Sequence, residues 1–380
     1  MTTDRTPFLA PLTGIRFIAA IFIFTVHVAL PTQGLEVASA VQVAGHEGMT
    51  IFFVLSGFIL AWNYDRVFGE RITLPGLRTY YVARIARIYP LYLAALLIAV
   101  LTVSSGGAVL RVLASGEFWL HAGALQTWSP DLSVAYGLNG PGWSIGVEFF
   151  LYALFPLLII PFRRIRHRSG ALIAVAVGSV IVLALVTAAF VLAGLADLPS
   201  TDPASAHRWL YRTPLARVPD FVLGIAVAYL AIHQPPPSAA RWGRTAQVVG
   251  TAAALGFMAI PPLASSVWSL DVAHMLPFAL VLIGLMWAPH TVLARALGSR
   301  AMVFLGECSF AFYLLHQTLI RLVGQPGDGW GSYATQWTLA FIITLLASAG
   351  AHLVIERPLR AGIRTLLDRK RPVPQAAHDL

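Results

Sequence analysis

The 380-residue sequence lacks most of the features on which soluble and disulfide- or metal-stabilised proteins depend. Only 11% of its residues are charged, whereas a soluble domain has about a quarter. Cys308 is the single cysteine, which excludes an intrachain disulfide and a thiol-rich metal site. HExxH, P-loop, GxSxG and strand-linked GxGxxG motifs are all missing. We therefore expect no metal site and no bound cofactor.

Lysine is nearly missing as well. Lys370 is the only lysine among 26 basic residues, and the formal net charge is +9. Nucleic acid is not an expected partner, because no basic patch is interleaved with aromatic residues that could stack on bases. The chain is 57% hydrophobic with a mean hydropathy of +0.73. In such a chain arginine indicates membrane topology, so the sequence predicts an all-α, polytopic membrane protein.

Long hydrophobic runs are abundant, and a span takes about 20 residues. Ten candidate spans lie near residues 10–30, 47–64, 85–104, 143–162, 170–194, 214–232, 245–262, 272–288, 301–322 and 336–355. We predict one transmembrane domain over residues 1–358 and a basic cytoplasmic tail over 359–380. A weaker apolar patch at 117–127 is too short to span.

The distribution of basic residues supports this count. If the N-terminus is cytoplasmic, 20 basic residues fall in inner segments and three in outer loops, and three more lie within or beside spans. Inner loops of membrane proteins are rich in arginine and lysine. The basic residues therefore alternate between rich inner and poor outer loops, as expected for about ten transmembrane helices with both termini in the cytoplasm.

The first predicted span carries two ionisable side chains, Arg16 and His27. They are eleven residues apart, which places them on one helix face and roughly 16 Å apart along the axis. An ionisable group inside a membrane needs a partner or a purpose. Either an active site runs through the membrane between them, or both residues only hold helices together.

The third predicted span begins with Arg84 and Arg87, which share a face at an i, i+3 spacing. Two adjacent guanidinium groups repel one another unless an anion lies between them, and arginine donates paired hydrogen bonds to phosphate. The pair therefore suggests a phosphate-rich ligand on the cytoplasmic side. Alternatively, the pair binds a lipid headgroup, or it only reflects the excess of arginine on the cytoplasmic side of membrane proteins.

The fourth predicted span begins with PGWSIGVEFFLYALFPLL, residues 141–158. Trp143 is an interface or packing aromatic, and Ser144 and Glu148 share a helix face. Glu148 lies at a similar depth to His27, where a carboxylate can orient a histidine and raise its basicity. A structural hydrogen bond is the alternative. His316 either faces the same space or is satisfied structurally.

Seven segments in order then identify a resemblance. They are Arg16 with His27, FFVLSGFIL (52–60), RIARIYP (84–90), PGWSIGVEFFLYALFP (141–156), VPDFVLGI (218–225), GECSFAFYLLH (306–316) and ERP (356–358). Together they resemble the acyltransferase-3 family of bacterial membrane O-acyltransferases, here without the fused esterase-like domain of some members.

The resemblance implies a ten-span enzyme in the bacterial cytoplasmic membrane. It would transfer an acyl group, such as acetyl, from cytoplasmic acyl-CoA to a hydroxyl of a glycan, a lipid-linked sugar or a secondary metabolite such as a macrolide. It also implies that His27 is catalytic, and that Arg16, Arg84 and Arg87 serve the acyl-CoA side. Acyl-CoA would be a co-substrate, and the membrane lipid a further partner.

From the residues we add two catalytic candidates: Glu148 as the group that orients His27, and Arg16 as the group that positions the donor or stabilises the oxyanion. Trp143, Ser144 and His316 are substrate-binding candidates. The alternative function is a transporter or flippase that uses the buried charges as a relay.

Overall fold

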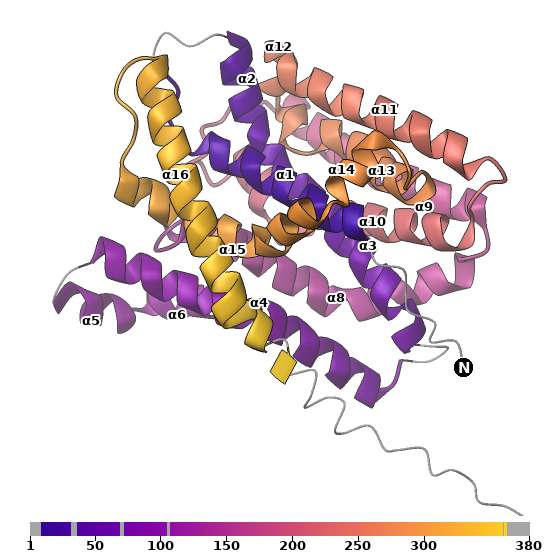
Figure 1. Cartoon of the computed structure of the whole chain (residues 1–380), viewed down its shortest axis with the longest axis horizontal. Helices are drawn as coiled ribbons and strands as arrows, with labels where there is room; N and C mark the ends of the chain where they lie inside the picture. The colour runs from indigo at the N-terminus through magenta and orange to yellow at the C-terminus, as the bar shows by residue number, and fades with distance from the viewer. Residues whose placement is uncertain (1–8, 32–35, 69–71, 105–106, 360, 363–380) are drawn as a thin grey trace, which may run out of the picture.

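The computed structural model of the chain describes residues 9–31, 36–68, 72–104, 107–359 and 361–362. Within these ranges the regular structure is entirely helical, as predicted. The helices are α1 (Ala10–Val26), α2 (Glu36–Ala44), α3 (Gly48–Phe68), α4 (Leu74–Val103), α5 (Gly107–Leu113), α6 (Gly116–Ala122), α7 (Leu132–Ala135), α8 (Trp143–Ile165), α9 (Ser169–Leu192), α10 (Val218–His233), α11 (Ala239–Ala259), α12 (Pro261–Ala264), α13 (Val272–Trp287), α14 (Val292–Leu297), α15 (Arg300–Val323) and α16 (Trp330–Ala351) (Figure 1).

Each of the ten predicted spans contains one long helix, namely α1, α3, α4, α8, α9, α10, α11, α13, α15 or α16. Seven helical stretches among the described residues are long and apolar enough to cross a membrane. They contain α3, α4, α8, α9, α10, α15 and α16. The helices α1 and α13 are apolar but shorter. The spans assigned to α1, α11 and α13, and the cytoplasmic location of the termini, therefore remain predictions.

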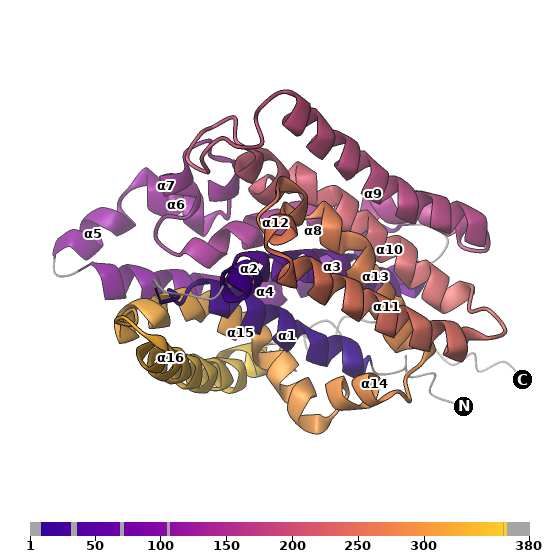
Figure 2. The same ribbon diagram turned by 90° about the horizontal axis from the view of Figure 1, so that it is seen from above.

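The helix α3 lies at the centre of the bundle, with other helices packed around it. In an apolar 18-residue window of Glu36–Asp65, the stretch that contains most of α3, 72% is buried, whereas in the corresponding window of Ser169–Leu192 (α9) 17% is buried. Figure 2 shows α3 in the middle of the molecule, with α9 and α16 at opposite edges. A helix that is apolar on every face is favoured at the centre of a bundle.

Glycine allows α3 and α10 to pack closely. A Cβ on Gly57 would collide with the carbonyl oxygen of Phe221, and a Cβ on Gly224 would collide with the carbonyl oxygen of Val54. Small residues at helix interfaces are the usual means of close approach in membranes. The packing fixes α10 against the helix that lines both cavities described below.

Several predicted boundaries differ from the structure, and those of α1 and α4 bear on the site. The helix α1 ends at Val26 rather than near residue 30, and His27 caps it through backbone bonds to Phe24 and Thr25. The helix α4 begins at Leu74, eleven residues before the predicted start, where the Thr73 hydroxyl accepts a hydrogen bond from Gly76 N at 3.3 Å. The predicted start was too late because arginines lower the hydropathy of the first turns of α4, although the helix continues through them. The predicted tail at 359–380 lies outside the described residues except for 359, 361 and 362.

Candidate active site

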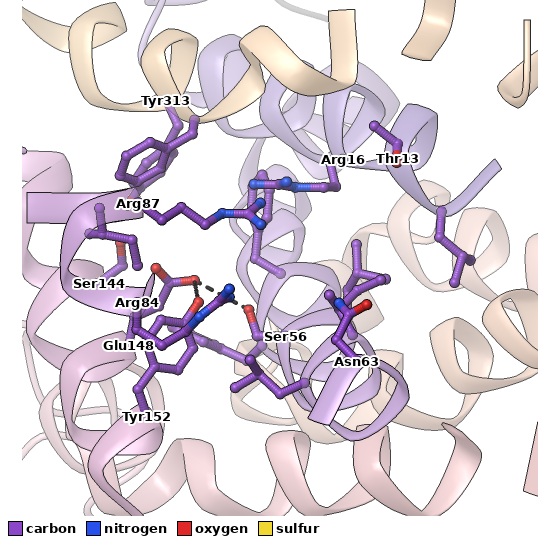
Figure 3. A pocket seen from close by; sticks show the side chains of 18 of the residues that line it. Thr13, Arg16, Ser56, Asn63, Arg84, Arg87, Ser144, Glu148, Tyr152 and Tyr313 are labelled. Atoms are coloured by element: carbon purple, nitrogen blue, oxygen red, sulfur yellow. Dashed lines mark hydrogen bonds between the residues drawn. The ribbon is translucent and has the colours of Figure 1, made fainter. Parts of the chain in front are cut away.

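A cavity of about 440 Å³ lies between α1, α3, α4, α8 and α15. We call it the arginine cavity, because Arg16, Arg84 and Arg87 all line it. Its other polar walls are Thr13, Ser56, Asn63, Ser144, Glu148 and Tyr152. Figure 3 shows the guanidinium groups of Arg16 and Arg87 pointing toward the middle of this cavity, although they come from different helices. Three cations in one cavity create a site for an anion.

Glu148 is the carboxylate of the arginine cavity. One of its oxygens accepts hydrogen bonds from Ser56 Oγ at 3.2 Å and from the Tyr152 hydroxyl at 3.3 Å (Figure 3). Arg16 and Arg87 act on it electrostatically. Glu148 is thus a negative charge that Arg16 and Arg87 share.

Arg84 is held by an aromatic side chain of α3. Its Nη2 donates to the Tyr64 hydroxyl at 3.2 Å, and its guanidinium lies 5.3 Å from the centre of the Tyr64 ring. Its Nε is buried and has no hydrogen-bond partner among the described residues. A buried donor left unsatisfied costs free energy, so a bound anion that accepts from Nε would stabilise this arrangement.

A second cavity, of about 220 Å³, has four histidines in its wall. We call it the histidine cavity, and the four are His27, His46, His207 and His316. Aromatic rings complete the wall: Trp143 and Tyr211 lie 5.1 Å apart between ring centres, and His46 lies 5.8 Å from Tyr211. Two side chains, Met49 and Tyr313, line both cavities.

The hydrogen bonds of His27 and His316 fix the tautomer of each ring. His316 Nδ1 lies 2.5 Å from the Tyr313 carbonyl oxygen, which can only accept, so Nδ1 carries the proton and Nε2 has a free lone pair. His27 Nδ1 lies 2.8 Å from the Ile23 carbonyl oxygen and 3.2 Å from His316 Nε2. Both are acceptors, so His27 Nδ1 is the protonated nitrogen.

In the neutral ring, the other nitrogen of His27, Nε2, then carries the lone pair. Among the described residues none donates to it or accepts from it, and His27 lines the histidine cavity. A neutral imidazole with one nitrogen held and the other free is the arrangement of a general base.

His207, on the far wall of the histidine cavity, is a neutral imidazole as well. Burial, together with the positive charges of Arg212 and Arg217, lowers its pKa to about 4. Its Nε2 lies 3.4 Å from the Tyr136 hydroxyl. Its Nδ1 is buried without a hydrogen-bond partner in the described part of the chain. The wall therefore presents uncharged polar groups between aromatic rings.

A buried charge cluster supports this wall from behind. Arg217 Nη1 lies 3.1 Å from Asp220 Oδ2 and 2.5 Å from Asp271 Oδ2. Arg217 Nε donates to the Tyr211 carbonyl oxygen at 2.7 Å. Arg217 and Asp220 are i, i+3 neighbours in the sequence, whereas Asp271 is brought to them only by the packing of α10 and α13.

The structure divides the predicted residues between the two cavities. Arg16, Arg84, Arg87, Ser144 and Glu148 line the arginine cavity, and His27, Trp143 and His316 line the histidine cavity.

The predicted contact between Glu148 and His27 is wrong. Glu148 bonds Ser56 and Tyr152, whereas the His27 ring is held by Ile23 and His316. Similar depth in the membrane does not make two helices neighbours.

Several residues of the site carried no signal in the sequence. Ser56 lies in the apolar run FFVLSGFIL, and His46 and His207 lie between predicted spans without any periodic context. Met49 and Tyr313 have the residue types of ordinary core positions. Only the packing of distant segments gives these residues a place in the site.

The chain is similar to known acyltransferases over almost its whole length. The acyltransferase-3 family model, described as an acyltransferase domain, matches residues 10–353. The acyltransferase MdmB of Streptomyces mycarofaciens is 31% identical over 97% of this chain and 95% of its own length.

More distant relatives have names that refer to polysaccharides. The exopolysaccharide production protein ExoZ of Rhizobium meliloti is 27% identical over 83% of this chain and 89% of its own length. The peptidoglycan O-acetyltransferase OatA of Listeria monocytogenes is 23% identical over 73% of this chain, which is 45% of its own length. No solved structure matches the chain.

Proposed function

This chain belongs to the acyltransferase-3 family, and from that membership we propose that it is an acyl-CoA-dependent membrane O-acyltransferase. The acyl group is short, such as acetyl, and the acceptor is a hydroxyl of a glycan, a lipid-linked sugar or a secondary metabolite. The enzyme acts in the bacterial cytoplasmic membrane, with the arginine cavity open to acyl-CoA from the cytoplasm. The family supports an enzyme over a transporter.

The single observation that carries the chemistry is the free Nε2 of His27. The ring is fixed through Nδ1 by the Ile23 carbonyl at 2.8 Å and by His316 at 3.2 Å. His316 is fixed in turn by the Tyr313 carbonyl. His27 is thus the general base, and His316 is a positioning residue rather than a group that binds substrate.

In the reaction, His27 Nε2 takes the proton from the acceptor hydroxyl. The oxygen then attacks the carbonyl carbon of the thioester, and the C–S bond breaks as the tetrahedral intermediate collapses. The proton passes from His27 to the sulfur of the leaving CoA. The products are an ester and CoA, so neither a metal nor a further cofactor is needed.

The arginine cavity suits the phosphates of CoA. Arg84 and Arg87 would donate forked hydrogen bonds to phosphate oxygens, and the buried Arg84 Nε has a donor to offer. Arg16 would position the donor from α1. Glu148 would hold the arginines in place, a role that differs from the one expected from the sequence.

The histidine cavity suits the acceptor. Trp143 and Tyr211 provide apolar ring faces, and His207 provides an uncharged hydrogen-bonding group. Ligand sites typically combine apolar walls with a few polar groups that fix orientation. The names of two relatives, which refer to exopolysaccharide and peptidoglycan, support a glycan.

The test uses purified protein in lipid nanodiscs, acetyl-CoA labelled in the acetyl group, and glycan and metabolite fractions from the source cells. We expect labelled ester together with released CoA thiol, and a loss of about 10²–10⁴-fold for His27→Ala, the usual contribution of a general base. Acyl profiles of cells with and without the gene would identify the acceptor. Transport of an unmodified compound without ester formation would refute the proposal.

A further inference from the structure

The arginine cavity and the histidine cavity meet at two side chains, Met49 of α3 and Tyr313 of α15. These two residues belong to the walls of both cavities. Both are nearly buried, with 3% and 6% of their surface exposed. We call this pair the neck. A route from the three arginines to His27 that runs through both cavities passes this shared part of their walls.

One side of the neck is rigid. The Tyr313 hydroxyl donates to the Pro141 carbonyl oxygen at 2.9 Å, and its ring lies 6.0 Å from that of Phe52. The Tyr313 carbonyl also holds His316 at 2.5 Å. The bond of the Tyr313 hydroxyl to Pro141 thus holds the ring, and the Tyr313 backbone is joined to the histidine pair.

The other side of the neck is adjustable. Methionine is unbranched and has three rotatable bonds, so its side chain can move along the wall of a cavity. Met49 lies in the first turn of α3, one residue before Thr50, whose hydroxyl is fixed by Asp271 at 2.8 Å. The backbone near Met49 is thus anchored, and any adjustment of this side of the neck falls to the unbranched Met49 side chain.

We propose that the neck selects the acyl group by its cross-section, so that straight short acyl groups are transferred and α-branched groups are excluded. The inference rests on the proposed function, because it requires the thioester to approach His27 from the arginine cavity. A straight acyl chain is no wider than the pantetheine arm that follows it. A branch next to the carbonyl adds width at the point that must pass between Met49 and Tyr313.

The size of the effect follows from the chemistry of small apolar sites. One methyl or methylene in a close-fitting apolar site changes selectivity by about 10- to 200-fold. Butyryl-CoA and isobutyryl-CoA contain the same atoms and differ only in branching. The ratio of their kcat/KM values therefore reports the effect of the cross-section of the acyl group, because the number of atoms is the same in both.

The experiment compares wild type with Met49→Ala, and uses Met258→Ala as the matched control. Met258 is equally buried, at 2% exposure, but it packs in α11 away from the neck. Met49→Ala should raise the isobutyryl-to-butyryl ratio at least about tenfold, and Met258→Ala should leave the ratio unchanged. An unchanged ratio in a Met49→Ala protein that still transfers acetyl would overturn the proposal.

A second variant covers the case in which Met49→Ala does not fold. Met49→Phe fills the neck, and should lower kcat/KM for butyryl-CoA relative to acetyl-CoA by a similar factor; no change in that ratio also overturns the proposal. If wild type transfers no acyl group from any CoA ester, the proposed function fails first. That outcome is distinct from one in which acyl groups are transferred but the ratios of kcat/KM do not change when Met49 is substituted.

Discussion

Replacement of His316 by alanine tests whether the two histidines act as one unit. His316 Nε2 accepts from His27 Nδ1 at 3.2 Å, and the Tyr313 carbonyl holds His316 from behind. The substitution removes one of two acceptors on His27 Nδ1 and leaves the Ile23 carbonyl at 2.8 Å. His27 should remain in place but be less well held.

The magnitude follows from the charge that develops on His27. When Nε2 takes the acceptor proton, the ring becomes a cation, and a hydrogen bond to a charged group contributes about 1.5–3 kcal/mol. That corresponds to roughly 10- to 150-fold in rate. Because 3.2 Å is at the long end of the range for such bonds, we expect His316→Ala to lower kcat about ten- to thirtyfold.

The assay is ester formation from labelled acetyl-CoA for wild type, both single variants and the double variant. Since His316 acts through His27, the His27→Ala/His316→Ala protein should be no slower than His27→Ala within a factor of about three. His316→Gln, which places an acceptor oxygen near the lost nitrogen, should recover part of the rate. His352→Ala removes another buried imidazole, bonded to Glu356 at 3.0 Å, and serves as the control for general loss of packing.

Two results would refute the reasoning. One is a His316→Ala protein, folded by thermal unfolding, with wild-type kcat. The other is a double variant whose loss equals the product of the two single losses, which would mean that the histidines act independently.

Four further outcomes are expected. Arg84→Lys should weaken acyl-CoA binding in nanodisc titrations, because lysine cannot make the forked contact with phosphate; unchanged affinity would leave Arg84 with a topological role only. Gly57→Val should prevent folding, since any Cβ there meets the Phe221 carbonyl, and wild-type thermal stability would contradict the close packing of α3 and α10. Burial holds the pKa of His207 near 4, below the unfolded value of 6.5. The free energy of unfolding should therefore fall as the pH drops from 6.5 to 4, because the unfolded chain binds a proton that the folded chain does not. His207→Gln should reduce this fall by up to about 3 kcal/mol, measured by thermal unfolding at several pH values, and identical slopes for the two proteins would disprove it. Reporter fusions at Ser169 should read cytoplasmic and those at Asp328 outside, as the arginine distribution predicts, and the reverse would overturn the ten-span topology.

The sequence by itself determined the class of the protein and the position of its helices. Composition excluded a soluble fold, since 57% of the residues are hydrophobic and 11% charged. Hydropathy located the long helices, because a lipid environment requires continuous apolar runs whose backbone groups bond internally. The order of short motifs identified the family, which the match over residues 10–353 then showed.

Helical periodicity also predicted which residues of one helix share a face. Arg84 and Arg87 line one cavity together, as do Ser144 and Glu148. Arg16 of α1 and His27, which caps that helix, reach different cavities. Such predictions hold because the spacing of 3.6 residues per turn is a local property of the backbone.

Only the tertiary structure decided which helices are neighbours. Periodicity sets the face of a helix but not its partner, so sequence reasoning paired Glu148 with His27 on depth alone. The packing instead places α15 beside α1, which brings His316 to His27, and places Glu148 of α8 beside Ser56 of α3. The neck joins Met49 and Tyr313, two residues more than 250 positions apart in the chain. It exists only because side-chain packing and close helix contacts are non-local.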